Sequence, residues 1–336
     1  MNGDDEGPPP TKKQKVNHDL FLAASAWIQT NGGFVHPAVH MEPELRTLST
    51  HACIPKDAIL FSIPSSCTLT IAERDNTELT EMMHVASSYY KFDSPQPDVH
   101  LACAFATEFE SKSTSFAPYF ALLPPNTEHD SLLRRWSDSE LDTLLPHSPL
   151  HQRALAQQEG MQRDHATICQ LIMSSRQSSS HKPEYKQTCL LPSLASYDHA
   201  LAVVTSRAFS GMSADGYDAL VPLLDLLNHT RGSSSKNVGY KWNNVTNMVD
   251  VFTTVEVMEN TILQNTYGTK GNAQLLSLYG FCIPNNREPD GSSNDVVEVF
   301  LHTVEEDVNA VTNGDEDEDE DGKRKSTDES ISVVSS

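Results

Sequence analysis

Clustered cysteines are missing from this sequence. Its six cysteines are scattered over 336 residues, and no two of them stand at CxC or CxxC spacing. Zinc sites and the disulfide frameworks of small secreted domains depend on such clusters. The fourteen histidines likewise form no HExxH motif. The sequence therefore predicts no metal site, and cysteines used this way are typical of a reducing compartment.

Long apolar runs are also lacking. Hydrophobic residues make up 38% of the chain, and no run approaches the roughly 18 apolar residues that a membrane span needs. The N-terminal MNGDDEGPPPTKKQKV is not a signal peptide, because its charges are not followed by an apolar stretch. PTKKQKV resembles a short nuclear import signal, although a solvated tail is an equal interpretation. We expect a monomer outside the membrane, located in the nucleus, the cytoplasm or both.

Positive charge is scarce. The chain has 24 Lys and Arg against 46 Asp and Glu, a formal net charge of -22. This balance argues against non-specific binding to a phosphate backbone, so we predict no direct nucleic-acid partner. It is compatible with a basic protein partner. No strand leads into a GxGxxG turn, which disfavours a Rossmann-type nucleotide-binding fold.

Strand-like segments lie towards both ends of the chain, and helical segments lie in the middle. LRTLSTHACI and AILFSIP are strand-like near the start, and MVDVFTTVEV, TILQNTYG and DVVEVFLHTV near the end. NAQLLSLYGF between them is a short helix. This order predicts an α+β domain with a helical insertion, not an alternating βαβ sheet. The predicted divisions are a disordered tail with a basic cluster (1–16), the N-terminal part of the β domain (17–70), the helical insertion (71–215), the C-terminal part (216–302) and a disordered acidic, serine-rich tail (303–336).

Three short motifs carry candidate functional side chains. ALVPLLDLLNHT is an apolar run that ends in polar groups, NTYGTKGNAQLLSLYGF holds two tyrosines that each precede a glycine, and SRAF holds an arginine. Each has a structural interpretation alone: a buried Asn or His caps or satisfies a turn, and a helical Arg pairs with a surface carboxylate. The candidates are Arg207, Asp225, Asn228, His229, Tyr267 and Tyr279.

In this order the motifs resemble a SET domain of the Rubisco lysine methyltransferase-like class. SRAF, VPLLDLLNH and YGTKGNAQLLSLYGF follow one another as in that class. FAPYFALLPPNTEHDSLLRRWSDSELDTLL resembles the start of its helical insertion, and IPKDAILFSIP resembles one of its β elements. The resemblance covers about residues 19–300. It implies an α+β SET-domain β-fold with a pseudoknot, interrupted by a helical insertion.

The resemblance also implies an activity: a protein-lysine N-methyltransferase that uses S-adenosyl-L-methionine. Tyr267 would be catalytic, orienting the amine and the methyl group, and Phe209 and Tyr279 would wall the amine channel. The aromatic residue at 209 favours a lysine acceptor over a histidine. The implied cofactor contacts are Asn228, His229, Arg207, Asp225 and the backbone of Ala58 and Leu60.

The sequence departs from the class in two places. MEPELRTLSTHACI has no glycine where the class has a glycine-rich element that lets backbone approach the cofactor, and Ala58 replaces a carboxylate residue. After VVEVF the chain is acidic and serine-rich, where the class continues into a helical substrate-binding domain. Two alternatives therefore stay open beside the lysine methyltransferase: a non-catalytic SET-like binding module and a protein-histidine N-methyltransferase.

Overall fold

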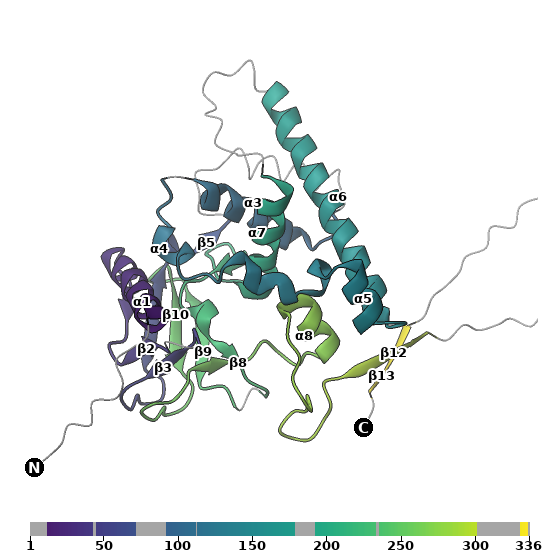
Figure 1. The fold of residues 1–336 in the computed structure, drawn as a ribbon. Helices are drawn as coiled ribbons and strands as arrows, with labels where there is room; N and C mark the ends of the chain where they lie inside the picture. The colour runs from purple at the N-terminus through teal and green to yellow at the C-terminus, as the bar shows by residue number, and fades with distance from the viewer. Residues whose placement is uncertain are drawn as a thin grey trace, which may run out of the picture.

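A computed structural model describes residues 12–42, 45–71, 92–111, 113–178, 192–232, 235–300 and 330–334. Most helices gather on one side of the molecule and most strands on the other, with α8 (Asn272–Tyr279) between the two groups (Figure 1). The α+β class and the helical insertion predicted from the sequence are thus confirmed. In the described parts of the chain, no helix is long and apolar enough to cross a membrane. Those parts also contain no group of three His, Cys, Asp or Glu side chains that could hold a metal ion.

The N-terminal β region begins with a helix. Its elements are α1 (Lys12–Thr30), β1 (Phe34–Val35), β2 (Val39–Met41), β3 (Leu48–Thr50), β4 (Ile59–Pro64), η1 (Ser65–Cys67) and β5 (Leu69–Thr70). α1 starts inside the 1–16 range that was predicted to be disordered, so this boundary was placed too late. The rest of that tail lies outside the described residues.

The β region is built around a four-stranded antiparallel sheet of order β1-β4-β10-β9, where β9 is Val238–Asn243 and β10 is Met248–Thr253. Val249 pairs with Ile63, and Val251 pairs with Phe61. These four side chains are buried, and α1 adds buried side chains to the same core. The predicted strands AILFSIP and MVDVFTTVEV are therefore adjacent in one sheet, and their paired apolar side chains share a buried face.

The helical insertion has a second core of its own. Its elements are α3 (Gln96–Glu110), α4 (Ala117–Phe120), η2 (Asn126–Ser131), η3 (Leu133–Arg135), α5 (Asp138–Leu144), α6 (Pro149–Ser178) and α7 (Leu194–Arg207). Phe105 of α3 and Tyr197 of α7 are fully buried in this core. The capping box expected at Ser137 and Glu140 starts α5: the Ser137 hydroxyl accepts from the Glu140 N–H, and the Glu140 carboxylate accepts from the Ser137 N–H.

The C-terminal part contains short strands that return to the β region. Its elements are β6 (Ala208–Phe209), β7 (Ala219–Leu220), η5 (Leu224–Leu226), β8 (Asn228–His229), β11 (Gln264–Asn265), α8 (Asn272–Tyr279), β12 (Val296–Phe300) and β13 (Ser330–Val334). β13 lies within the 303–336 range predicted to be disordered, and it pairs antiparallel with β12. The remainder of that tail lies outside the described residues.

The apolar run ALVPLLDLLNHT is mostly irregular. Only its two ends are strands, Ala219–Leu220 and Asn228–His229, and Leu223 has a positive φ of 67° before the turn η5. Residues 221–227 are all buried nonetheless. A buried turn directs successive side chains to different sides, so Asp225 and Asn228 can reach one cavity from two directions.

Gly280 ends α8 and fits closely against the insertion. It has a φ of 76°, and a Cβ there would overlap the Ser131 side chain and lie 3.2 Å from the Ser131 carbonyl carbon. Gly216 has the same φ of 76° with nothing within 4 Å of the corresponding Cβ position. An alanine would therefore strain the backbone equally at both positions, but only at position 280 would its Cβ also clash with a neighbouring residue.

We expect Gly280→Ala to lower the free energy of unfolding by about 2–5 kcal/mol, as left-handed strain of about 1–2 kcal/mol adds to overpacking of about 1–3 kcal/mol. Gly216→Ala should cost only the strain. Urea denaturation of the two variants beside the unchanged chain measures both. Equal losses would show that the contact with Ser131 is not restrictive.

Candidate active site

Two adjoining cavities lie where the β region meets the insertion. The first, about 360 Å³, is called the polar cavity here, and the second, about 380 Å³, the aromatic cavity. Both are lined by Ser206, Arg207, Asp225, Tyr267 and Tyr279. The polar cavity is completed by Leu45, Arg46, Pro124, Glu128, His129, Leu226, Asn228 and Phe281. The aromatic cavity is completed by Ala208, Phe209, Ser210, Leu227, Tyr240, Asn265, Thr266 and Gly268.

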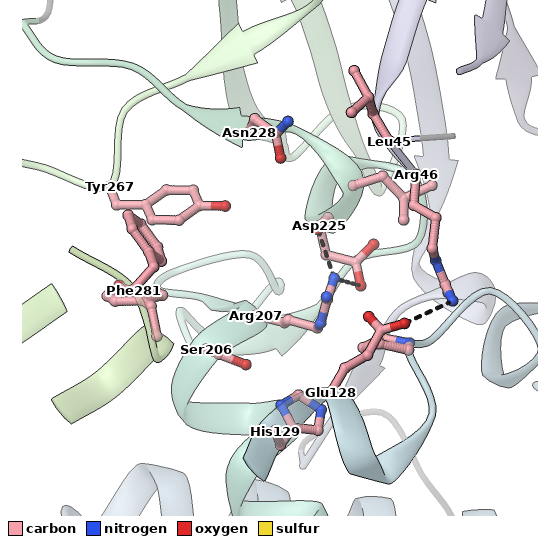
Figure 2. A pocket seen from close by; sticks show the side chains of 13 residues that line it. Leu45, Arg46, Glu128, His129, Ser206, Arg207, Asp225, Asn228, Tyr267 and Phe281 are labelled. Atoms are coloured by element: carbon pink, nitrogen blue, oxygen red, sulfur yellow. Dashed lines mark hydrogen bonds and ion pairs between the residues drawn. The ribbon is translucent and has the colours of Figure 1, made fainter. Parts of the chain in front are cut away.

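A pair formed by the half-buried Arg207 and the buried Asp225 lies at the centre of the polar cavity (Figure 2). Arg207 Nη1 donates to the carbonyl oxygen of Asp225 at 2.9 Å and lies 3.7 Å from Asp225 Oδ2. The Tyr119 hydroxyl donates to the same Oδ2 at 3.0 Å. Burial raises the pKa of Asp225, and the charge of Arg207 opposes that shift. Among the described residues, Arg207 Nε and Asp225 Oδ1 have no hydrogen-bond partner, so a donor and an acceptor are left for a ligand.

Leu45 and Arg46 form the wall of the polar cavity that lies across from Tyr267 and Phe281 (Figure 2). Arg46 has a φ of 49°, the left-handed conformation that glycine adopts most easily. It lies in the stretch MEPELRTLSTHACI, where the absent glycines were noted. The Arg46 guanidinium donates to the carbonyl oxygen of Leu122 and lies 3.8 Å from Glu128 Oε1. Contacts to the insertion therefore hold an arginine in a glycine-like conformation.

The catalytic candidate Tyr267 is fixed between the two cavities. β8 and β11 pair in parallel, with Asn228 opposite Gln264 and His229 opposite Asn265. The Tyr267 N–H donates to His229 Nδ1 at 3.0 Å, and the Tyr267 hydroxyl donates to the carbonyl oxygen of Leu227 at 3.0 Å. Burial raises the pKa of Tyr267. The hydroxyl thus stays protonated and directed at a backbone oxygen where the cavities meet.

Two aromatic pairs form the aromatic cavity. Tyr267 and Tyr279 stack at 4.9 Å between ring centroids, and Phe209 and Tyr240 meet edge to face at 5.1 Å. Burial raises the pKa of Tyr279 to about 12. Four aromatic rings around one space favour a slender aliphatic chain. Tyr240 was not predicted, since nothing in the strand segment VGYKWN tells which face turns towards the site.

Comparisons with known proteins agree with this architecture. No protein-family model matches the chain. N-lysine methyltransferase setd6 of Xenopus tropicalis is 24% identical over 338 residues, which cover 94% of this chain and 69% of that protein. Its Xenopus laevis counterpart is 26% identical over 324 residues, which cover 89% of this chain and 66% of that protein.

The solved structures show the fold. The SET domain of LSMT bound to lysine and AdoHcy superposes with a TM-score of 0.64 at 18% identity, over 89% of this chain and 63% of that one. Rubisco LSMT bound to AdoMet gives 0.62 at 18% identity, over 86% of this chain and 61% of that one. The chain has a SET-domain fold. It spans about two thirds of the length of the Xenopus relatives.

Within this SET domain, most predicted site residues come together. Arg207, Asp225, Asn228, Tyr267 and Tyr279 line the polar cavity, and Phe209 lines the aromatic cavity. His229 lines neither cavity, and its ring instead positions the backbone of Tyr267.

Ala58 and Leu60 line neither of the two cavities, and their contact with the cofactor stays a prediction. The Ala58 N–H donates to Thr253 Oγ1 at 3.0 Å, and its carbonyl accepts from the Thr253 N–H at 3.0 Å. Leu60 is fully buried, and its carbonyl accepts from the His36 N–H. Their backbone groups serve the sheet, and Leu45 and Arg46 in the preceding loop take the place beside the cavity.

Proposed function

We propose that this SET domain is an S-adenosyl-L-methionine-dependent protein-lysine N-methyltransferase. The observation that carries the proposal is the pair of cavities meeting at Tyr267, one polar and one aromatic. The solved relatives include LSMT bound to lysine and AdoHcy, and Rubisco LSMT bound to sinefungin and monomethyllysine. We assign the polar cavity to the cofactor and the aromatic cavity to the lysine side chain.

The polar cavity fits an α-amino acid group. A carboxylate needs N–H donors, and Arg207 Nε is buried without a partner among the described residues. An ammonium group needs acceptors, and Asp225 Oδ1 is equally unpartnered there. Asn228 lines the same cavity. S-Adenosyl-L-methionine ends in such a group and supplies a methyl on a positively charged sulfur.

The aromatic cavity suits the acceptor. A lysine amine must lose its proton before it can attack, which costs roughly 4–5 kcal/mol at neutral pH from a pKa of about 10.4. Burial between Phe209, Tyr240, Tyr267 and Tyr279 disfavours the charged form and so lowers that pKa. The Tyr267 hydroxyl and the Leu227 carbonyl, 3.0 Å apart, mark where the nitrogen meets the methyl group. These groups position the reactants for in-line displacement, and positioning supplies much of the rate.

Cofactor binding tests the assignment. Calorimetric titration with S-adenosyl-L-methionine should show saturable binding that Asn228→Ala weakens by at least about tenfold, because the cavity loses an amide that hydrogen-bonds a charged group. Tyr267→Phe, which leaves the polar cavity intact, should bind within about twofold of the unchanged chain. Absence of binding by the folded, unchanged chain would favour the non-catalytic binding module.

Charge supports a proposal about the substrate and the location. A formal net charge of -22 favours a lysine in a basic protein segment over a nucleic-acid partner. We propose that the chain acts as a monomer in the nucleus, the cytoplasm or both. Substituting Lys12, Lys13 and Lys15 by alanine in a fluorescent fusion tests the import signal, since an unchanged nuclear fraction would show that PTKKQKV is a solvated tail.

A further inference from the structure

A histidine of the insertion lines the polar cavity without an assigned role. His129 lies in η2 and is 7% exposed. Its Nε2 is buried and has no hydrogen-bond partner among the described residues. Figure 2 shows the ring beside Glu128 and near Ser206, on the side of the cavity away from Asn228. Buried polar nitrogens are rarely left unsatisfied, so this one calls for a ligand atom.

The surroundings of His129 keep its ring neutral. Burial lowers the pKa of His129 to about 3, and the positive charges of Arg207, Arg135 and Arg134, together with His199, act in the same direction. A neutral imidazole carries one N–H donor and one acceptor nitrogen. With arginines around it, the site attracts an anion, and the tautomer that serves an anion has its proton on Nε2.

Three residues that line the polar cavity each carry a buried atom without a hydrogen-bond partner among the described residues. Arg207 Nε and, in this tautomer, His129 Nε2 are donors, whereas Asp225 Oδ1 is an acceptor. Two donors and one acceptor match an α-carboxylate beside an α-ammonium group. Neither a nucleobase nor a lysine side chain has this combination of charges.

We infer that His129 Nε2 donates a hydrogen bond to the α-carboxylate of S-adenosyl-L-methionine, beside Arg207. The inference rests on the proposed function and makes the helical insertion a direct part of the cofactor site. His129 is then a binding residue that distinguishes ligands with an amino acid group from those without one.

Two nucleosides test this contact. S-Adenosylhomocysteine carries the amino acid group, and 5′-methylthioadenosine lacks it. His129→Asn, which is too short to reach, should weaken S-adenosylhomocysteine binding by about tenfold, as expected for a hydrogen bond to a charged group. It should change 5′-methylthioadenosine binding by less than about twofold. His129→Gln, whose amide nitrogen can replace Nε2, should restore most of the affinity.

His199 provides the matched control. It is 8% exposed, lies 5.9 Å from the His129 ring and hydrogen-bonds Asn126, but it does not line the polar cavity. His199→Asn should leave the ratio of the two affinities unchanged. An equal loss for both nucleosides in His129→Asn, or no loss for S-adenosylhomocysteine, would overturn the inference. If the unchanged chain binds neither nucleoside, the proposed function itself is wrong.

Discussion

Tyr267→Phe is expected to lower the rate of methyl transfer about 10²- to 10³-fold while cofactor affinity stays within about twofold. The hydroxyl donates to the Leu227 carbonyl at 3.0 Å, at the junction of the polar and aromatic cavities. Its removal takes away a fixed dipole at the point where the reactants align. In other enzymes, the loss of one such preorganised donor lowers the rate by about 10²- to 10³-fold. Ring stacking with Tyr279, at 4.9 Å, is kept in the variant.

Single-turnover transfer of labelled methyl to a basic protein or peptide mixture measures this effect, with affinity measured separately. A fall in rate without a fall in affinity means that the hydroxyl acts in the transition state. Tyr217→Phe is the matched control, because Tyr217 is an exposed tyrosine outside both cavities. A Tyr267→Phe rate within tenfold of the unchanged chain would remove Tyr267 from the chemistry.

Stability should fall as the pH drops from about 6.5 to 5, with His129 as a main cause. Burial holds its pKa at about 3, against 6.5 for an ordinary histidine. In this window the unfolded chain binds a proton at this position and the folded chain does not, so the free energy of unfolding rises with pH. The stabilisation is complete above pH 6.5 and is lost by about 1.4 kcal/mol per pH unit below it, or about 2 kcal/mol by pH 5.

Urea denaturation at pH 7 and pH 5 checks this expectation. His129→Gln should lose about 2 kcal/mol less than the unchanged chain between these values, because glutamine does not titrate. His36, His199 and His229 also have lowered pKa values, so a residual slope is expected. An unaltered slope in His129→Gln would show that this ring is not held neutral.

The motifs could predict the centre of the site because they are short and locally rigid. SRAF, VPLLDLLNH and YGTKGNAQLLSLYGF bring Arg207, Asp225, Asn228 and Tyr267 to one place, whichever loops join them. Periodicity predicted α8 and β10 for a similar reason, as each has an apolar face to bury.

The rim of the site could not be predicted from the same patterns. The left-handed conformation of Arg46 depends on distant contacts with Leu122 and Glu128, which no local pattern encodes. His129 lies in the short helix η2, and it lines the same cavity as Arg207 because of how the whole insertion packs. Ala58 and Leu60 were assigned to the cofactor from the motif IPKDAILFSIP, which contains β4, and neither residue lines the two cavities.

The parallel pairing of β8 with β11 has a consequence for folding kinetics. It joins Asn228 to Gln264, while the polar cavity is lined by residues from Leu45 to Phe281. Contacts between such distant segments form late, because a long loop must close before they contribute. A chain still emerging from the ribosome has no binding pocket until Phe281 is available. A ligand of this pocket therefore slows unfolding far more than it speeds folding, and protects the finished protein rather than guiding its assembly.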